Sequence, residues 1–322
     1  FSSRRRHTRF RNVTGVQTCA LPIYVEKLLS MPECIAAMED AYVELAEGRG
    51  VSRLRSDSFT PTERPDALYS LKSMDGICPK LGVGAVRINS DIVTWPQDGG
   101  NARRVKVPAA PGNRYVGLVL LFSVANGEPL AIMPDGVMQR IRVGAANALA
   151  IKYLARPEAR SVAMLGSGWQ AGAQAMGVAA VRKLDVIRVF SPNKANREAF
   201  ASEMRAHLGL DVVAVDSPDA AVENADIVMC ASNTIDPIFH KKWLKPGLHL
   251  SAIKRPEIGP ETLKACDVLL IHSHDRKPMQ LAAKGVNVRE LSEDRGWMVA
   301  DDLDRKSTRL NSSHVSESRM PS

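Results

Sequence analysis

The chain is poor in cysteine and lacks the cysteine spacings that carry chemistry. Its five cysteines include no C-x-x-C pair, the spacing expected of metal ligation. Four of them lie between residues 24 and 304, namely Cys34, Cys78, Cys230 and Cys266. We therefore expect buried free thiols in a reducing cytoplasm, and neither a metal site nor a disulfide framework.

Long apolar runs are also missing. No run reaches the roughly 18 residues that a membrane-spanning helix needs, and we expect no membrane partner. Residues 24–304 contain no internal repeat and no low-complexity linker. This stretch is long enough for one large α/β unit or for two ordinary domains with sizeable cores.

Acidic residues are absent from the first 23 positions, which hold Arg4, Arg5, Arg6, Arg9 and Arg11. Such a start is typical of a mitochondrial transit peptide or of a phosphate-binding arm. Residues 305–322 are again basic and serine-rich. The net charge of +8 lies entirely in these two ends, because residues 24–304 contain as many acidic as basic side chains. The folded part is therefore not expected to bind nucleic acid.

Both ends resemble conceptual translations of sequencing-adaptor DNA, an interpretation that we rank above a transit peptide. Neither end has the repeated apolar positions that would offset the entropy of ordering it. We expect residues 1–23 and 305–322 to be non-native tails that lie outside the fold.

The first half of the remaining sequence predicts a helix followed by an antiparallel sheet. Residues 25–50 place apolar side chains at helical spacing and end at Gly48 and Gly50. Strands are predicted at residues 67–75, 81–91 and 115–135. In the last of these, Asn126-Gly127 indicates a hairpin turn, because both positions tolerate a positive φ. A helix rich in small residues, 136–155, then leads to a second domain.

The second half alternates strands and helices. The expected strands are 161–166, 186–191, 211–215, 225–232, 249–253 and 268–273, with helices at 170–183 and up to about residue 208. This alternation predicts right-handed crossovers. The expected fold class is α/β, with a Rossmann-type doubly wound parallel sheet over residues 135–304 and a smaller α+β domain over residues 24–134.

A glycine-rich turn follows the first of these strands. Residues 166–171 read G-x-G-x-x-A, and they are Gly166, Ser167, Gly168, Trp169, Gln170 and Ala171. The first glycine permits a tight turn, the second lets the backbone approach a pyrophosphate, and the alanine keeps helix and strand close. An ordinary strand-to-helix turn is the alternative, but the strand-turn-helix context favours dinucleotide binding. Ser232 and Asn233, after a later strand, are expected to join the cofactor site.

The end of the second strand bears on the choice of cofactor. An acid about 20 residues past the glycines would bind the ribose 2′-hydroxyl of NAD. The chain has no acid there and offers Ser191, Asn193, Lys194 and, one turn on, Arg197. We expect NADP or NAD, with a slight preference for NADP. The alternative is that Lys194 and Arg197 belong to a solvated helix face.

These motifs together resemble the ornithine cyclodeaminase/mu-crystallin family. The resemblance is carried by "MQRIRVGAANALAIKYLA" followed closely by "VAMLGSGWQA", with "ADIVMCASNT" and "WLKPGLHLSAI" downstream. It implies a homodimer whose first domain binds substrate and forms the dimer interface, while the Rossmann domain binds the nicotinamide cofactor. It also implies hydride transfer at the Cα of a small amino or imino acid.

The family's basic residues, which hold the substrate carboxylate, correspond to Arg55, Arg87 and Arg142, with Lys72 as an alternative to Arg87. A guanidinium suits this role because it offers a planar fork of two donors. Each of these side chains has the alternative of pairing structurally. For Arg142, which stands beside Gly144 on a close-packed helix, we favour substrate binding.

The sequence departs from the cyclodeaminases after residue 253. Pro256 stands where those enzymes carry a catalytic Asp, and Glu257 lies next to it. This departure favours a ketimine reductase or amino-acid dehydrogenase over an ornithine cyclodeaminase, with Glu257, Lys72 or water serving the proton transfer. A non-catalytic NADP-binding protein is a third hypothesis. His272 and His274 are two residues apart in a loop, and we expect no metal site there.

Overall fold

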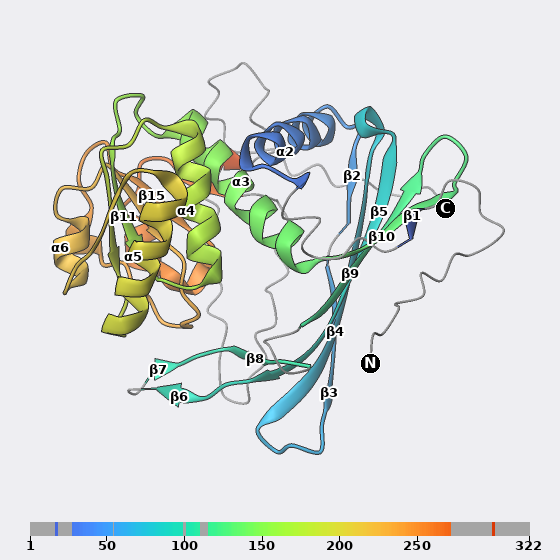
Figure 1. Ribbon diagram of the computed structural model, residues 1–322, viewed down its shortest axis with the longest axis horizontal. Coiled ribbons are helices and arrows are strands. Elements are labelled where there is room, and N and C mark those ends of the chain that lie inside the picture. The colour runs from blue at the N-terminus through green and yellow to red at the C-terminus, as the bar shows by residue number, and fades with distance from the viewer. Residues whose placement is uncertain are drawn as a thin grey trace, which may run out of the picture.

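The computed structural model describes residues 17–18, 28–53, 55–98, 101–109, 115–271 and 298–299. It has two halves, each built on a sheet, and helices α2 (Met31–Ala46) and α3 (Gly136–Leu154) lie between them (Figure 1). The predicted tails and both of their junctions lie outside the described residues, except for β1 (Gln17–Thr18), which pairs in parallel with β10 (Pro129–Pro134). The α/β fold class with two sheets is confirmed.

Helix α2 begins later than the apolar spacing alone predicted. Ser30 caps it in a capping box with Glu33, and Pro32 occupies the first turn. These two signals fix the start of a helix, because Ser accepts a free amide N–H and Pro has none to satisfy. The helix buries Met31, Cys34 and Ile35 against Ile141 and Leu149 of α3, which ties the first half to the linking helix.

The first half contains an eight-stranded sheet, and its central strands are antiparallel. The order is β1, β10, β9 (Val116–Ser123), β5 (Val83–Thr94), β4 (Ala67–Cys78) and β2 (Val51–Ser52), with β3 (Ser56–Pro61) also on β4 and β8 (Val105–Val107) on β5. The predicted hairpin turn is present, with Gly127 at φ 76°. A two-stranded ribbon, β6 (Gln97–Asp98) and β7 (Asn101–Ala102), lies beside the sheet.

The second half is the predicted parallel sheet. Its order is β13 (Asp211–Ala214), β12 (Val186–Phe190), β11 (Ser161–Leu165), β14 (Ile227–Cys230) and β15 (His249–Ala252). Helices α4 (Trp169–Val181) and α5 (Lys194–Leu208) form one core with it. The short helix α6 (Pro218–Val222) belongs to a second core, and α7 (Pro260–Leu263) follows β15. The sheet reverses its strand order between β11 and β14, and this crevice is where such folds bind ligands.

One predicted strand of the parallel sheet is wrong. Residues 268–273 were expected to extend it, but β16 (Leu270–Ile271) pairs with β17 (Met298–Val299) in a separate two-stranded sheet. A short apolar run specifies a strand but not its partner, which depends on tertiary contacts.

Candidate active site

The predicted cofactor residues meet at the carboxyl edge of the parallel sheet. Leu165, Phe190 and Cys230 are paired across β12, β11 and β14, so the residues that follow each strand lie at one edge. Ser167 Oγ lies 2.8 Å from Ser191 Oγ, which joins the first two of these loops. A cavity of about 310 Å³ opens beside Gly168, between α3, α4 and α5.

The two glycines of the turn serve different needs. Gly166 has φ 129°, and a Cβ there would lie 2.2 Å from the Ala231 carbonyl oxygen, so the fold itself requires glycine. A Cβ on Gly168 would meet no atom within 4 Å. Gly168 therefore leaves open space in front of the first turn of α4, where free amide N–H groups attract a phosphate. The turn fits a dinucleotide pyrophosphate.

The two cations near the second strand are differently placed. Arg197 is buried, donates to the Ser191 carbonyl oxygen at 3.1 Å and pairs with Asp216 at 2.6 Å. Lys194 is 70% exposed and lies 3.8 Å from Glu198. Asn193 caps α5 through its side chain. Arg197 thus stabilises the loop after β12 and pairs with Asp216, whereas Lys194 projects into solvent.

Opposite the cofactor edge, one face of the antiparallel sheet is strongly polar. Lys72 pairs with Asn89 across β4 and β5, and Met74 pairs with Arg87. Since directly opposed residues share a face, Lys72, Arg87 and Asp91 all lie on it. Asp135, at the start of α3, contacts the same face. Its Oδ2 accepts a hydrogen bond of 3.0 Å from the side-chain amide of Asn89.

Arg142 of α3 lies close enough to Arg87 of this face for the two charges to interact. Arg87 holds Asp135 through two hydrogen bonds of 2.8 and 2.7 Å. Arg142 has no hydrogen bond or ion pair with any residue that the structure describes, and burial lowers its pKa, with a further contribution from Arg87. Arg142 is half-buried, and its guanidinium has no partner among the described residues, so it is available for an anion.

Lys72 and Asp91 form a buried pair in the same row. Their side chains are 8% and 1% exposed, and Lys72 Nζ lies 3.1 Å from Asp91 Oδ2. Burial lowers the pKa of Lys72 to about 8, and the charges of Arg104 and Lys106 lower it further against the opposing effect of Asp91. Lys106 shares the same carboxylate at 2.9 Å. A lysine that titrates near neutrality in a buried site can take part in proton transfer.

Arg55 lies apart from Arg87 and Arg142, although the three were expected together. It pairs with Asp57 at 2.8 Å, and Asp57 stands opposite Lys72 on β3. Its charge acts on Arg104, whose pKa is lowered mainly by burial. The structure thus places Arg87 and Arg142 near each other and Arg55 at a separate position, near Arg104.

Glu257 lies in the protein interior, whereas a proton donor must reach the substrate. It is fully buried, and its carboxylate accepts hydrogen bonds from Ser232 N–H at 2.5 Å, Ser232 Oγ at 2.8 Å and Lys254 N–H at 3.1 Å. Burial raises its pKa, although these bonds and Lys254 oppose the rise. Glu257 therefore fixes the loop after β14, and Asn233 is exposed at the tip of that loop.

Arg104 is the residue that sequence reasoning missed. Its backbone N–H donates to the Asn233 carbonyl oxygen at 3.4 Å, and Arg103 forms a β-bridge with Thr234. The first half of the chain therefore contacts the end of β14 directly. The "ARR" stretch at 102–104 carries no motif, and only the fold brings it to the cofactor edge.

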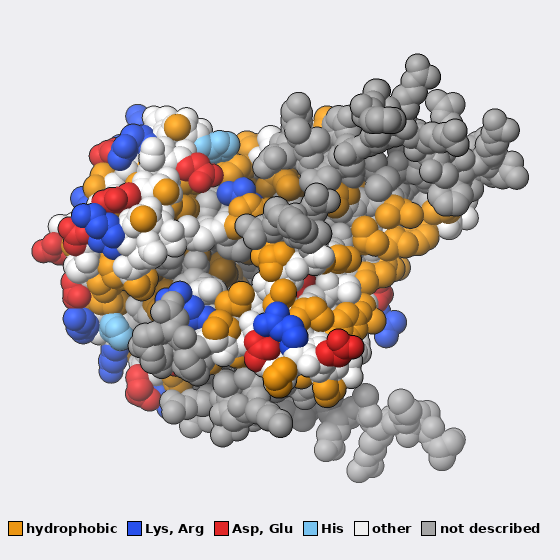
Figure 2. Space-filling model, turned by 60° about the horizontal axis from the view of Figure 1, so that its bottom comes forward, with side chains coloured by type: hydrophobic (Ala, Val, Ile, Leu, Met, Phe, Trp, Pro, Cys, Tyr) orange, Lys and Arg blue, Asp and Glu red, His pale blue; other side chains and the backbone are white. Residues whose placement is uncertain are grey.

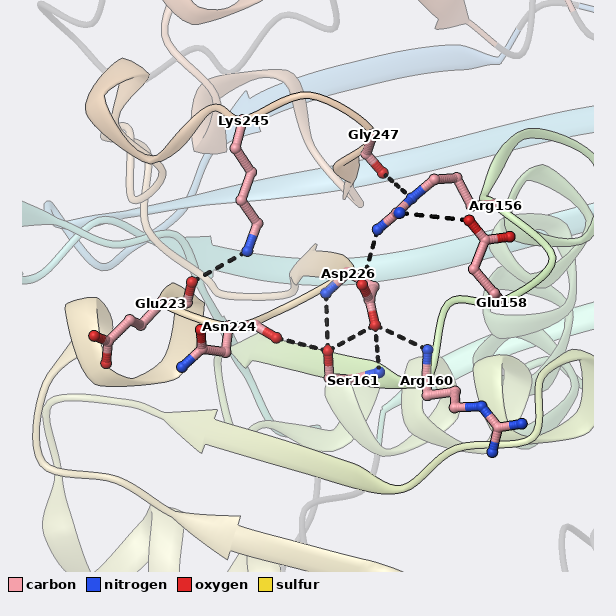
Figure 3. Close-up of polar contacts among 9 residues, drawn as sticks. All are labelled: Arg156, Glu158, Arg160, Ser161, Glu223, Asn224, Asp226, Lys245 and Gly247. Carbon is pink, nitrogen blue, oxygen red and sulfur yellow. Dashed lines mark hydrogen bonds and ion pairs between the residues drawn. The ribbon is translucent and has the colours of Figure 1, made fainter.

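The opposite edge of the parallel sheet carries a separate polar cluster (Figure 3). Asp226 accepts from Ser161 Oγ at 2.8 Å and from the Arg160 and Ser161 amides, and Arg156 joins it at 2.9 Å. Arg156 also donates to the Gly247 carbonyl oxygen at 3.0 Å. These contacts lie at the amino ends of β11 and β14, so they brace the sheet away from the active-site edge.

The described residues contain no cluster of three or more potential metal ligands, and His272 and His274 lie outside them. Four cysteines are free thiols, and of these Cys34 and Cys230 are buried. No helix in the described part of the chain has the length and apolar character to cross a bilayer.

Comparisons with known proteins agree with the fold. The sequence profile of the ornithine cyclodeaminase/mu-crystallin family matches residues 101–273. The chain is 27% identical to the Δ1-pyrroline-2-carboxylate reductase of Bacillus cereus over 70% of its own length and 65% of the relative's. It is 30% identical to the ketimine reductase mu-crystallin of Macropus fuliginosus over 62% of each chain.

A solved structure is similar over both halves. It is the Δ1-pyrroline-2-carboxylate reductase of Thermococcus litoralis in complex with NADH and L-proline, with a TM-score of 0.65, 26% identity, and coverage of 78% of this chain and 75% of that one. The chain spans about two thirds of the length of the curated relatives, and the family profile covers more than half of the chain. The chain therefore belongs to the ornithine cyclodeaminase/mu-crystallin family.

Proposed function

We propose that the protein is an NAD(P)-dependent oxidoreductase that reduces an imino acid at Cα, or reversibly oxidises the amino acid. The observation that carries this proposal is the unpartnered Arg142 beside Arg87, on a polar sheet face that lies opposite an open dinucleotide turn. The reductase relatives from Bacillus cereus and Thermococcus litoralis, the latter bound to NADH and L-proline, support it.

In this mechanism the protein mainly positions groups. Arg142 and Arg87 hold the substrate carboxylate. The reduced cofactor supplies a hydride, which adds to Cα as the C=N π bond breaks and its electron pair moves to nitrogen. Lys72 donates the proton that the nitrogen takes up, because its lowered pKa of about 8 suits transfer near neutral pH. Glu257 holds the Ser232 loop and does not touch the substrate.

An ornithine cyclodeaminase is the second candidate. It is less favoured because Pro256, where cyclodeaminases carry their Asp, has no group to accept a proton, and because Glu257 uses its carboxylate in the protein interior. Incubation with ornithine and NAD tests it, and rapid formation of proline and ammonia would replace our proposal.

For the cofactor we propose NADP or NAD. The absence of a carboxylate after β12 and the exposed Lys194 support a slight preference for NADP, whereas the ion pair of Arg197 with Asp216 removes one cation from that role. Comparison of the two Kd values in wild type and Lys194→Ala tests this preference.

We also propose a homodimer formed through the outer face of the antiparallel sheet. Several apolar side chains are exposed on this face, including Val51, Leu71, Ile77, Val116 and Leu118, and Figure 2 shows hydrophobic side chains gathered over the half of the molecule that holds the sheet. A contiguous apolar surface of this kind marks an interface.

Arg142→Ala tests the proposed function. NAD(P)H oxidation is followed at 340 nm with α-keto acids plus ammonium or methylamine, and with cyclic imines. We expect kcat/KM to fall by roughly tenfold to more than a hundredfold, since a hydrogen bond between charged groups contributes about 1.5–3 kcal/mol. The cofactor Kd should stay the same. Equal activity in wild type and variant would assign Arg142 a structural role.

A further inference from the structure

We propose that the substrate is dicarboxylic, with its second acidic group held by a distal cation group made of Arg55, Arg104 and Lys106. This inference rests on the proposed function, in which Arg87 and Arg142 hold the α-carboxylate. It concerns the part of the sheet face that the mechanism leaves unused.

The distal cation group lies in line with the proposed carboxylate site. Lys72 is the diagonal neighbour of Arg87 on β4 and β5, and such neighbours are roughly 7–8 Å apart. Arg104 and Lys106 both act on Lys72 electrostatically, and Arg55 acts on Arg104. Arg87, Lys72 and the distal cation group thus follow one another across the face. This order matches the α-carboxylate, the nitrogen and the side-chain acid of a short dicarboxylic substrate.

The distal cation group has more positive charge than its neighbours balance. Asp57 is paired with Arg55, and Asp91 is shared between Lys72 and Lys106. Arg104 has no side-chain hydrogen bond with any described residue. Burial and the charge of Arg55 lower its pKa against the opposing effects of Asp91 and Asp57, so an anion placed here would relieve the repulsion between Arg104 and Arg55.

A buried hydroxyl also lacks a partner here. Ser70 stands directly opposite Asp91, on the side of Lys72 away from Met74. It is fully buried, and its Oγ has no hydrogen-bond partner among the described residues. Its O–H can donate to a carboxylate, and buried polar groups in proteins are nearly always satisfied. Asp57 Oδ1 is also unpartnered, but it is an acceptor and adds no donor for an acid.

Arg104 is held where a substrate would react. Its backbone bond to Asn233 and the adjacent bridge at Thr234 fix it against the loop after β14, beside the crevice at which the parallel sheet reverses order. These contacts hold the backbone of Arg104, and its guanidinium, which has no side-chain hydrogen bond with a described residue, offers a planar fork of donors to a carboxylate.

The test compares the imines formed from ammonium with oxaloacetate, 2-oxoglutarate or pyruvate, measured with wild type, Arg104→Gln and, as an exposed control, Arg64→Gln. We expect wild type to prefer a dicarboxylic substrate by at least about tenfold in kcat/KM, and Arg104→Gln to reduce that preference about ten- to hundredfold. Arg64→Gln should change neither value, since Arg64 pairs only with exposed Asp66.

The outcomes separate the two proposals. Turnover of pyruvate imine with no gain for the diacids, or an equal loss on all substrates in Arg104→Gln, would overturn the dicarboxylic assignment and leave the oxidoreductase proposal standing. Absence of turnover with every imine, despite NAD(P)H binding, would count against the proposed function itself. If Arg104→Gln does not fold, thermal shifts of wild type with NADH and either glutamate or alanine decide, and we expect only glutamate to stabilise the protein.

Discussion

At the scale of single residues, the half-buried Arg87 and Arg142 differ in how many of their hydrogen-bond donors are already used. Arg87 is committed to Asp135 by two hydrogen bonds, whereas Arg142 has no described partner. A residue with unused donors loses little when it turns to a ligand. We therefore propose Arg142 as the main anchor of the substrate carboxylate, with Arg87 held nearby by Asp135.

Lys72 predicts a pH dependence. Its pKa of about 8 lies below the ordinary lysine value, so the protonated form, which we propose as the proton donor, is lost as the pH rises through 8. We expect kcat/KM to be flat below about pH 8 and to fall by about tenfold per pH unit above it. Lys72→Arg keeps its charge over this range, so its profile should lack this fall. An unchanged alkaline limb in Lys72→Arg would show that another group titrates.

The two turn glycines predict opposite phenotypes. Gly168→Val should abolish the fluorescence enhancement of NAD(P)H without lowering Tm, because its Cβ meets no protein atom but occupies the phosphate position. Gly166→Ala should lower Tm, since its Cβ would overlap the Ala231 carbonyl. Fluorescence titration and thermal denaturation measure the two effects. Full cofactor binding in Gly168→Val would refute the dinucleotide assignment.

At the scale of elements, β15 contains a half-buried histidine with a buried Nε2 atom, and this residue makes the free energy of unfolding depend on pH. Burial lowers the pKa of His249 to about 4, with a further contribution from Arg182, and its Nε2 has no described partner. In the unfolded chain His249 binds a proton with a pKa of about 6.5, whereas in the folded chain it does so only near pH 4. The free energy of unfolding should therefore decrease as the pH falls from about 6.5 to 4, by up to about 1.4 kcal/mol per unit.

His249→Leu should flatten this part of the curve. Urea denaturation at pH 7 and at pH 4.5 gives the difference directly, and His207→Leu, an exposed-helix variant, serves as the control. Parallel losses of stability in wild type and His249→Leu would assign the acid sensitivity to other groups.

Most elements could be predicted from local signals, but their partners could not. The helix at 136–155 and the strands around the glycine turn have continuous apolar patterns, and they appear nearly as expected. Strand β3 has polar residues on its exposed face and Pro61 at its end, so it gives no apolar run. The pairing of Lys72 with Asp91 depends on strand register, and the contact of Arg104 with Asn233 depends on how the halves pack. Neither follows from sequence spacing.

At the scale of the whole molecule, the exposed apolar sheet face predicts the oligomeric state. Leu71 and Leu118 are each 41% exposed on it. We expect light scattering after size exclusion to give twice the chain mass for wild type and the monomer mass for the double variant Leu71→Glu/Leu118→Glu. Cofactor binding should survive, because the parallel sheet lies elsewhere. A monomeric wild type would contradict the dimer.

Close packing of α3 on α4 has a consequence for turnover. A Cβ on Gly144 would lie 2.3 Å from the Ala173 carbonyl oxygen, and one on Gly177 would lie 2.6 Å from that of Gly144, so the two helix backbones are in close contact at these positions. Arg142 is therefore locked to the dinucleotide-binding half, while Arg87 belongs to β5 in the other half. Because two hydrogen bonds tie Arg87 to Asp135 at the start of α3, we expect a hinge motion to pull the two guanidinium groups apart, and to loosen the product carboxylate, only when these bonds break. Stopped-flow measurements should then find product release, and not hydride transfer, slowed by added viscogen.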